Sequence, residues 1–259
     1  MINDLYEVYE RLALSKTDIT SLSELVKKSV RENVAFTYVP KEGRPGDSDI
    51  YVRQIKKFPI ELRSRSGTII NELRSCLDSL ACVLAERNNQ SAKNVYFPIS
   101  KSLTIFETDG MRKIKNLSEA DKNTIVEISP YMNGNPTLFR LHHADIERKH
   151  IRLLGVGTSN SGAHFGGGVS VTSEAELHVY DSHFDDVEIR EMHYKSGYII
   201  PTDGTSLLIV DGAPDALRIQ FAVSFIFVQP DVISDLELIK TLIEFYNEVE
   251  RVIRLFDHG

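Results

Sequence analysis

The first thirty residues carry an amphipathic pattern that is typical of a long helix. Apolar side chains recur at steps of three and four residues between positions 5 and 30, the period that places them on one helix face. The polar residues 15–18 interrupt this stripe, so a kink or a break is expected there. Residues 34–39 and 50–55 then flank a segment rich in glycine, proline and aspartate, which predicts a β-hairpin.

A second helix is predicted from Pro59 to about residue 87. Its apolar positions again follow the helical period, but one flank is small or polar throughout. That flank consists of Gly67, Asn71, Arg74, Asp78, Ala81 and Ala85. Small residues at this spacing let another helix approach closely, and the polar ones then need partners. We therefore expect a second helix to pack along this row.

The middle of the chain predicts a short extended segment at residues 95–99 and two further helices. The first begins at a capping box that starts with Ser118 and ends before Pro130. The second has Asn135 as its N-cap and Pro136 at its first position. An apolar stripe on this helix includes His143 and His150.

From about residue 155 the helical period gives way to alternation. Residues 155–168 are rich in glycine and serine and are expected to form a loop or loose hairpin. Candidate strands follow at 169–172, 176–180, 186–193, 197–200, 206–210 and 217–228. Short linkers between them favour an antiparallel sheet.

A last helix is predicted from a capping box at Ser234 to about residue 256, with two adjacent apolar seams. Such a helix is covered on two sides, so we expect it to pack into the N-terminal bundle. The predicted fold class is α+β, a helical bundle formed by N- and C-terminal helices with an inserted antiparallel β-rich segment. The expected divisions are 1–154 for the bundle with its hairpin, 155–230 for the β-rich insertion and 231–259 for the returning helix.

Composition narrows the class of protein. The chain has 259 residues and a net charge of −7, which disfavours strong nonspecific binding to nucleic acid. Four local basic clusters, among them residues 112–115, are expected to be solvated unless they converge in space. The N-terminus lacks an export pattern and the longest nearly apolar stretch, 221–228, is too short to span a bilayer. We therefore expect a soluble cytoplasmic protein without a membrane segment.

The two cysteines and the histidines give little support to a metal or a disulfide. Cys76 and Cys82 fall in one predicted helix, about 9 Å apart and beyond disulfide reach, so they are expected to be buried packing thiols. His178, Asp181, His183 and Asp185 offer ligand atoms but are interpreted as polar decoration of a strand end. We expect no metal and no cofactor, and the common nucleotide-binding and hydrolase motifs are missing.

Five residues remain as candidates for a catalytic or binding site. Arg74 and Asp78 lie one helical turn apart, which allows either a packing ion pair or a reactive pair. His143 and His150 are interpreted as core histidines or as general bases. Lys149 adjoins His150. We expect the two helices to form one shared polar cluster in which Asp78 faces Lys149 or His150.

Several short motifs resemble those of a widespread bacterial family of uncharacterised function. Its members read roughly G-D-x-L-H-N-L-R-S-A-L-D-H-L, then F-P-I, Q-P-Y and D-K-H. The counterparts here are Gly67 with residues 73–80 (LRSCLDSL), residues 97–99 (FPI), 129–131 (SPY) and 149–150 (KH). Order and spacing agree over about residues 20–155.

The helical part of that family is in turn similar to HEPN domains, which are helical bundles found in defence and toxin systems. Active HEPN ribonucleases use an arginine and a histidine in an R-x4-6-H motif at a dimer interface. Arg74 matches the arginine, but Ser79 stands where the family has the histidine. A serine does not supply an acid or a base near neutral pH.

These observations predict a non-catalytic or regulatory HEPN-like protein that binds a partner, either another protein or RNA, and that forms a homodimer. The first alternative is a metal-independent endoribonuclease that uses His150 or His143 with Arg74. The second is a small-ligand sensor that binds through the β segment. An open cleft around the candidate residues would favour an enzyme or ligand site, and a closed network would favour a structural role.

Overall fold

The computed structural model describes two compact units, and each is built from separate stretches of the chain. It describes residues 4–40, 47–54, 56, 58–150, 154–165, 169–172, 176–184, 187–195, 205–212 and 219–257. Side chains are described for residues 4–34, 56, 58–149, 154–157 and 223–257. One unit comprises Met1–Glu24, Ile60–Gly155 and Phe227–Gly259, and the other comprises Leu25–Pro59 and Val156–Ile226.

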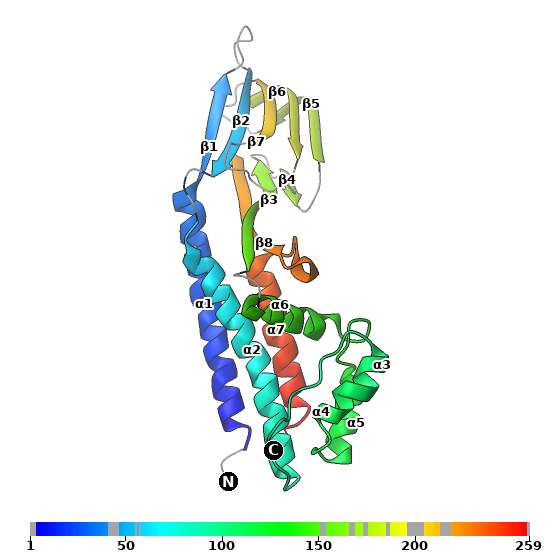
Figure 1. Cartoon of the computed structure of the whole chain (residues 1–259). Coiled ribbons are helices and arrows are strands. Elements are labelled where there is room, and N and C mark those ends of the chain that lie inside the picture. Colours follow the sequence, from blue (N-terminus) through cyan, green and yellow to red (C-terminus); the bar gives the residue numbers. More distant parts are fainter. Residues whose placement is uncertain are drawn as a thin grey trace. The chain divides into compact units, whose positions relative to one another are not determined.

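The first unit is a helical bundle to which both ends of the chain contribute (Figure 1). Its main helices are α1 (Tyr6–Asn33, whose first part lies in this unit), α2 (Ile60–Arg87), α5 (Glu119–Ile128), α6 (Pro136–His150) and α7 (Leu238–Arg254). Helix α7 packs against both α2 and α6, and large side chains such as Leu12, Leu73 and Phe245 are buried between the helices. The predicted α+β class and the return of the C-terminal helix to the bundle are confirmed.

The break that the pattern allowed in the first helix is wrong. Helix α1 continues through residues 15–18, where Ser15 Oγ donates to the carbonyl of Arg11 at 3.1 Å and Thr17 Oγ1 to that of Ala13 at 3.2 Å. Hydroxyl groups bonded to the preceding turn satisfy themselves without breaking the helix. The polar residues therefore change the surface of α1 without ending the helix.

A helical segment that the pattern did not predict lies between residues 103 and 113. It consists of α3 (Leu103–Ile105), the π-helical turn η1 (Phe106–Gly110) and α4 (Met111–Lys113). The side chain of Phe106, the first residue of the π-turn, is buried and only 1% exposed. Isolated π-turns within helices occur frequently at functional sites, so the surroundings of this segment are of interest.

Of the three N-caps predicted from capping motifs, two are confirmed. Ser118 Oγ accepts from the backbone N–H of Asp121 at 3.1 Å and Asn135 Oδ1 from that of Leu138 at 3.1 Å. The start predicted at Ser234 is wrong, because a 3-10 turn, η4 (Asp231–Ile233), precedes it and the N-cap of α7 is Glu237. The Glu237 carboxylate accepts from the backbone N–H groups of Ile239 and Lys240 and takes the role of a shorter capping side chain.

Side chains at the end of α2 tie distant parts of the sequence together. Arg87 pairs with Asp4 and donates through Nη1 to the carbonyl oxygen of Phe256 at 2.7 Å. Nearby, Tyr9 Oη donates to Asp257 at 2.8 Å. The first turn of α1, the end of α2 and the residues after α7 are thereby fixed to one another.

The β strands form two sheets. The first has the order β1-β2-β7-β6-β5, made of β1 (Val34–Pro40), β2 (Asp47–Gln54), β7 (Thr205–Gly212), β6 (Val187–Lys195) and β5 (Glu176–Phe184), and each of its neighbouring pairs is antiparallel. The second has the order β4-β3-β8, made of β4 (Val169–Thr172), β3 (Gly155–Phe165) and β8 (Ile219–Gln229). The antiparallel β-rich segment is confirmed.

Two details of the β region differ from the prediction. Residues 155–165, expected in a loop or a loose hairpin, form strand β3, which pairs antiparallel with β4 and also neighbours β8. This pairing satisfies a backbone whose small side chains carry little pattern of their own. The hairpin β1–β2 was grouped with residues 1–154, but β2 pairs with β7 and so belongs to the same sheet as strands of the 155–230 segment. The strand predicted at 197–200 lies outside the described residues.

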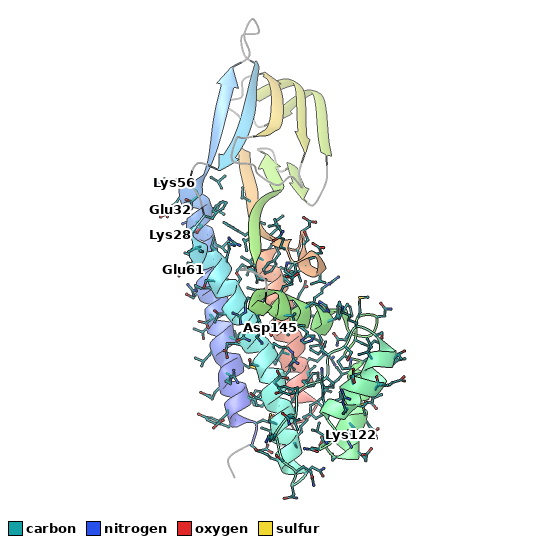
Figure 2. All side chains as sticks on the ribbon, in the orientation of Figure 1. Lys28, Glu32, Lys56, Glu61, Lys122 and Asp145 are labelled. Atoms are coloured by element: carbon teal, nitrogen blue, oxygen red, sulfur yellow. The ribbon has the colours of Figure 1, made fainter. Side chains whose placement is uncertain are left out.

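None of the described helices combines the length and the apolar character that crossing a bilayer would require. Helix α1, for example, carries charged side chains on its exposed surface. Lys28 and Glu32 are two of them, and both are labelled in Figure 2. Their i,i+4 ion pair is 3.8 Å long and both side chains are exposed, so it contributes little to stability.

Candidate functional site

The small and polar flank of α2 packs against α6, as the sequence predicted. A Cβ atom at Gly67 would collide with the side chain of Arg148, so glycine at this position lets Arg148 lie directly against α2. Further along, Asn71 Nδ2 donates to Asp145 Oδ1 at 3.1 Å, and Arg74 Nε donates to His142 Nδ1 at 3.2 Å. As α2 advances, its partners on α6 therefore run backwards along that helix.

Arg74 is the centre of a closed hydrogen-bond network. The residue is 5% exposed. Its guanidinium donates to Asp78 Oδ1 at 2.7 Å, to the carbonyl oxygen of Phe97 at 2.9 Å and to His142 at 3.2 Å. Each of the three guanidinium nitrogens thus has a protein acceptor. Three of its five N–H groups are thus engaged, and Arg74 lines neither of the two hollows described below, so its burial keeps it from a ligand.

Asp78 completes this network by binding the same stretch of main chain. Its Oδ1 atom accepts the backbone N–H of Phe97 at 2.9 Å, while Arg74 binds the Phe97 carbonyl. The ion pair therefore clamps both sides of a residue whose ring is fully buried, 0% exposed. The expected pairing of Arg74 with Asp78 is confirmed, and its visible role is to hold the segment at residue 97 on α2.

The expectation that Asp78 faces Lys149 is wrong. Lys149 Nζ lies 2.5 Å from Asp145 Oδ2, and Asp145, on α6 (Figure 2), in turn accepts from Asn71. Asp78 lies seven residues beyond Asn71, about 10 Å along the α2 axis. Because the sequence shows which flanks meet but not their register along the axis, it paired the wrong cation with Asp78.

Sequence reasoning missed His142 because it followed the apolar stripe through His143. His142 belongs to a second stripe with Asp145 and Lys149, and that stripe faces the polar row of α2. The spacing of three and four residues between these positions was the available evidence. Because Nδ1 of His142 accepts from Arg74, its ring proton lies on Nε2.

Burial, and then the positive charge of Arg74, lower the pKa of His142 to about 3. The positive charges of Lys113 and Lys149 act in the same direction. Protonation of Nδ1 would place a second positive charge beside Arg74 and would remove the acceptor of the Arg74 Nε–H group. His142 is therefore a neutral imidazole near neutral pH, with Nε2–H as a donor of fixed identity.

This depressed pKa predicts a loss of stability on acidification. The ordinary value is 6.5, so as the pH falls the unfolded chain binds the proton first. The stabilisation is complete above pH 6.5 and is lost progressively between pH 6.5 and pH 3. From about pH 7 to about pH 5 the free energy of unfolding, measured by urea titration, should fall by about 2 kcal/mol through this group.

His142→Asn is the matched variant for this measurement, because its side-chain oxygen can still accept from Arg74 Nε but cannot titrate. Wild type should lose about 2 kcal/mol more than the variant over the same pH interval. Equal losses in the two proteins would show that His142 is not held neutral by this network.

His143 lies beside the network and does not bind Arg74. Its ring centroid is 4.3 Å from that of Phe139, and burial, followed by the charge of Lys101, lowers its pKa. The side chain of His150 lies outside the described part of the chain. Of the five candidates, Arg74 and Asp78 share one network, Lys149 belongs to another and His143 opens onto a separate hollow.

That hollow, here called the basic hollow, has a volume of about 440 Å³. Its polar lining consists of Ser100, Lys101, Arg112, Lys113, His142 and His143. Ile99, Ile105 and Ile146 supply an apolar wall, and Asp109 completes the rim. The charge cluster at 112–115 thus meets the histidines of α6, and the sequence did not show that these segments converge.

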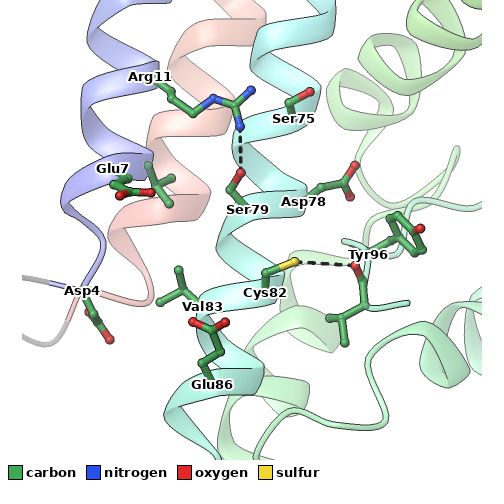
Figure 3. A pocket seen from close by; sticks show the side chains of 12 residues that line it. Asp4, Glu7, Arg11, Ser75, Asp78, Ser79, Cys82, Val83, Glu86 and Tyr96 are labelled. Carbon is green, nitrogen blue, oxygen red and sulfur yellow. Dashed lines mark hydrogen bonds between the residues drawn. The ribbon is translucent and has the colours of Figure 1, made fainter. Parts of the chain in front are cut away.

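A second hollow of about 470 Å³ lies between α1 and α2 and is shown in Figure 3. Arg11 reaches across it and donates to Ser79 Oγ at 2.9 Å and to Glu72 Oε2 at 2.8 Å. Ser79, where the resembling family has histidine, is therefore a hydrogen-bond acceptor. Asp78 and Glu86 also line the hollow, but the Cys82 thiol donates to the carbonyl oxygens of Ala92 and Val95 and not to either carboxylate.

The cysteines differ in their surroundings. Cys76 is buried as predicted, and burial raises the pKa of its thiol to about 11. Cys82 is only partly buried and lines the second hollow (Figure 3), so the prediction of complete burial is wrong there. Burial, then the charges of Asp78 and Glu86, also raise the pKa of the Cys82 thiol, which keeps it a poor nucleophile.

Among the side chains that the structure describes, no three histidine, cysteine or acidic residues gather in a way that could hold a metal ion. The ligand-bearing strand end at His178 and His183 lies on β5, where side chains are outside the description, and Asp185 is itself outside it. Comparison of the chain with family models, with curated proteins and with solved structures found no match.

Proposed function

We propose that this protein is a non-catalytic HEPN-like binding protein. The observation that carries the proposal is the burial of Arg74, 5% exposed, with each of its three guanidinium nitrogens donating to a protein acceptor at 2.7–3.2 Å. An arginine that assists phosphoryl transfer must present free N–H groups to the substrate. Here the same groups hold the fold together.

The motif segments around Gly67, Arg74, Phe97 and Pro130 support the same proposal, because they have packing roles. Gly67 admits Arg148, and Arg74 with Asp78 clamps Phe97. The backbone N–H of Ser100 donates to the carbonyl of Pro130 at 3.0 Å, which joins the FPI segment to the SPY segment. The motifs are thus explained by a shared bundle architecture and require no shared reaction.

The basic hollow is the surface through which we propose that binding takes place. It is open, and it presents Lys101, Lys113 and the two histidines beside an apolar wall. The resemblance extends the proposal to a homodimer with a role beside defence or toxin systems. A partner bound in the hollow would meet charge and apolar surface together, the usual composition of a binding site.

A second candidate is a metal-independent ribonuclease, because His143 lines an open basic hollow and is neutral near pH 7 with a lowered pKa. His143 would take the proton of a ribose 2′-hydroxyl, and the adjacent cations would stabilise the developing charge. His142 cannot then protonate the leaving group, since its pKa is about 3. This missing acid makes the binding role the better supported of the two.

Incubation with a fluorescently labelled single-stranded RNA in the presence of EDTA separates the two candidates. We expect no cleavage above the rate of a no-protein blank, for wild type and for His143→Ala alike. Cleavage by wild type that His143→Ala abolishes, in a variant with an unchanged thermal melt, would overturn the non-catalytic assignment.

A further inference from the structure

The charges that line the basic hollow are not all engaged by the protein. Arg112 Nη2 lies 2.7 Å from Asp109 Oδ1, and both side chains are exposed. Lys101 and Lys113 have no ion pair within the described part of the chain. The opening therefore keeps two positive charges that no described carboxylate neutralises, one from the residue after the Ser100 bridge and one from α4.

His142 adds an uncharged donor at the inner side of the same hollow. Arg74 occupies its Nδ1 atom, so the proton resides on Nε2, and no side chain in the described ranges bonds that nitrogen. This Nε2–H group can donate a hydrogen bond to an anion while the buried ring stays neutral. The buried guanidinium behind it orients the imidazole, so Arg74 acts on a ligand only through His142.

The remaining wall is suited to an apolar group. Ile105 is 43% exposed and Ile146 is 38% exposed, and both line the hollow. Its volume of about 440 Å³ lies within the range of small-molecule sites, roughly 300–1,000 Å³. The π-turn η1, which contributes Asp109 to the rim, shapes this side of the opening.

We infer that the basic hollow binds a small molecule that carries a phosphate group on an apolar or aromatic body. The phosphate dianion lies between Lys101, Lys113 and the Nε2–H of His142, and the body lies against Ile105 and Ile146. Two lysines and one neutral donor match the charge and the acceptors of a phosphate monoester better than those of a monoanionic carboxylate. The inference rests on the proposed binding role and specifies its ligand class.

Isothermal titration calorimetry with phenyl phosphate tests this assignment, with phenol as the probe that lacks the phosphate. Wild type should bind phenyl phosphate with a Kd below about 1 mM and phenol at least about tenfold more weakly. Lys113→Met keeps the length of the side chain and removes its charge, and it should weaken binding by about tenfold or more. His142→Asn, which keeps the acceptor for Arg74, should weaken binding by roughly fivefold.

Lys115→Met is the matched control, because Lys115 is exposed two residues further on and does not line the hollow. It should leave the affinity for phenyl phosphate within about twofold of wild type. Equal weakening by Lys113→Met and Lys115→Met would overturn the site. It would show that the ligand responds to the net positive charge of the surface and not to a contact with Lys113. A thermal melt of each variant separates loss of binding from loss of fold.

Two other outcomes also decide the question. If wild type fails to bind phenyl phosphate at about 5 mM, a ligand concentration that detects even weak sites, the ligand class is wrong, while the non-catalytic role stands as long as RNA is not cleaved. If a short RNA binds through Lys101 and Lys113 and phenyl phosphate does not displace it, the hollow is a nucleic-acid contact instead. RNA cleavage that depends on His143 would refute the proposed function itself.

Discussion

Replacing Asp78 by alanine is expected to lower the free energy of unfolding by about 3 kcal/mol, measured by urea denaturation near neutral pH. The variant leaves the buried Arg74 guanidinium without its 2.7 Å carboxylate and the Phe97 N–H without its acceptor. The loss is placed at the lower end of the range for broken buried pairs, because the Asp78 side chain is 33% exposed and water can replace part of its contribution.

Glu61→Ala is the matched control on the same helix. Glu61 pairs with Arg65 at 3.3 Å across the same i,i+4 spacing, but the Glu61 side chain is 55% exposed. Removing it should cost less than about 1 kcal/mol. If Asp78→Ala proves as mild as Glu61→Ala, the clamp on Phe97 is not structural, and Asp78 becomes available for a role in binding or catalysis.

Replacing Phe245 by alanine is expected to cost about 4 kcal/mol, the largest effect of a single substitution considered for this chain. Phe245 lies on α7 and is 2% exposed, so its removal forfeits the burial of an aromatic ring and leaves a cavity in the bundle. Because α7 is contributed by the far end of the sequence, this variant measures how much the bundle depends on that helix.

Ile243→Ala, two positions earlier on α7, provides the comparison, because Ile243 is 44% exposed. It should change the free energy of unfolding by less than about 1 kcal/mol. A small effect of Phe245→Ala, similar to that of Ile243→Ala, would mean that packing of α7 contributes little to the stability of the bundle. In that case deletion of residues 234–259 should also leave a cooperative melt.

The sequence predicted the pairing of Arg74 with Asp78 and gave Lys149 the wrong partner, for a physical reason. The i,i+4 spacing of Arg74 and Asp78 and the small residue at Gly67 are local properties of one helix, and they correctly indicated a packed polar flank. Which residue of α6 meets Arg74 depends on the register between two helices, and no local pattern encodes that. His142 was therefore missed and Lys149 was paired with the wrong acid.

The same distinction applies to the fold. Helix starts at Ser118 and Asn135 were predictable because capping is a contact within four residues. The cap expected at Ser234 was wrong because a 3-10 turn at Asp231–Ile233 delays the start of α7. Glu237 caps the helix instead. Strand β3 pairs with β4 and with β8, which begins more than fifty residues later, and β2 pairs with β7 more than a hundred residues away. Alternation within a short window could not reveal these partners.

The tie between Arg87 and the residues after α7 has a consequence for synthesis on the ribosome. Arg87 bonds the carbonyl of Phe256, 169 positions later, and Tyr9 bonds Asp257, 248 positions later. Contacts of such sequence separation close slowly and late in folding. Helices α1 and α2 must therefore wait, with their apolar faces uncovered, while the intervening strands and then α7 are translated. The unfinished bundle is therefore the state in which exposed apolar surface makes the chain most prone to aggregation.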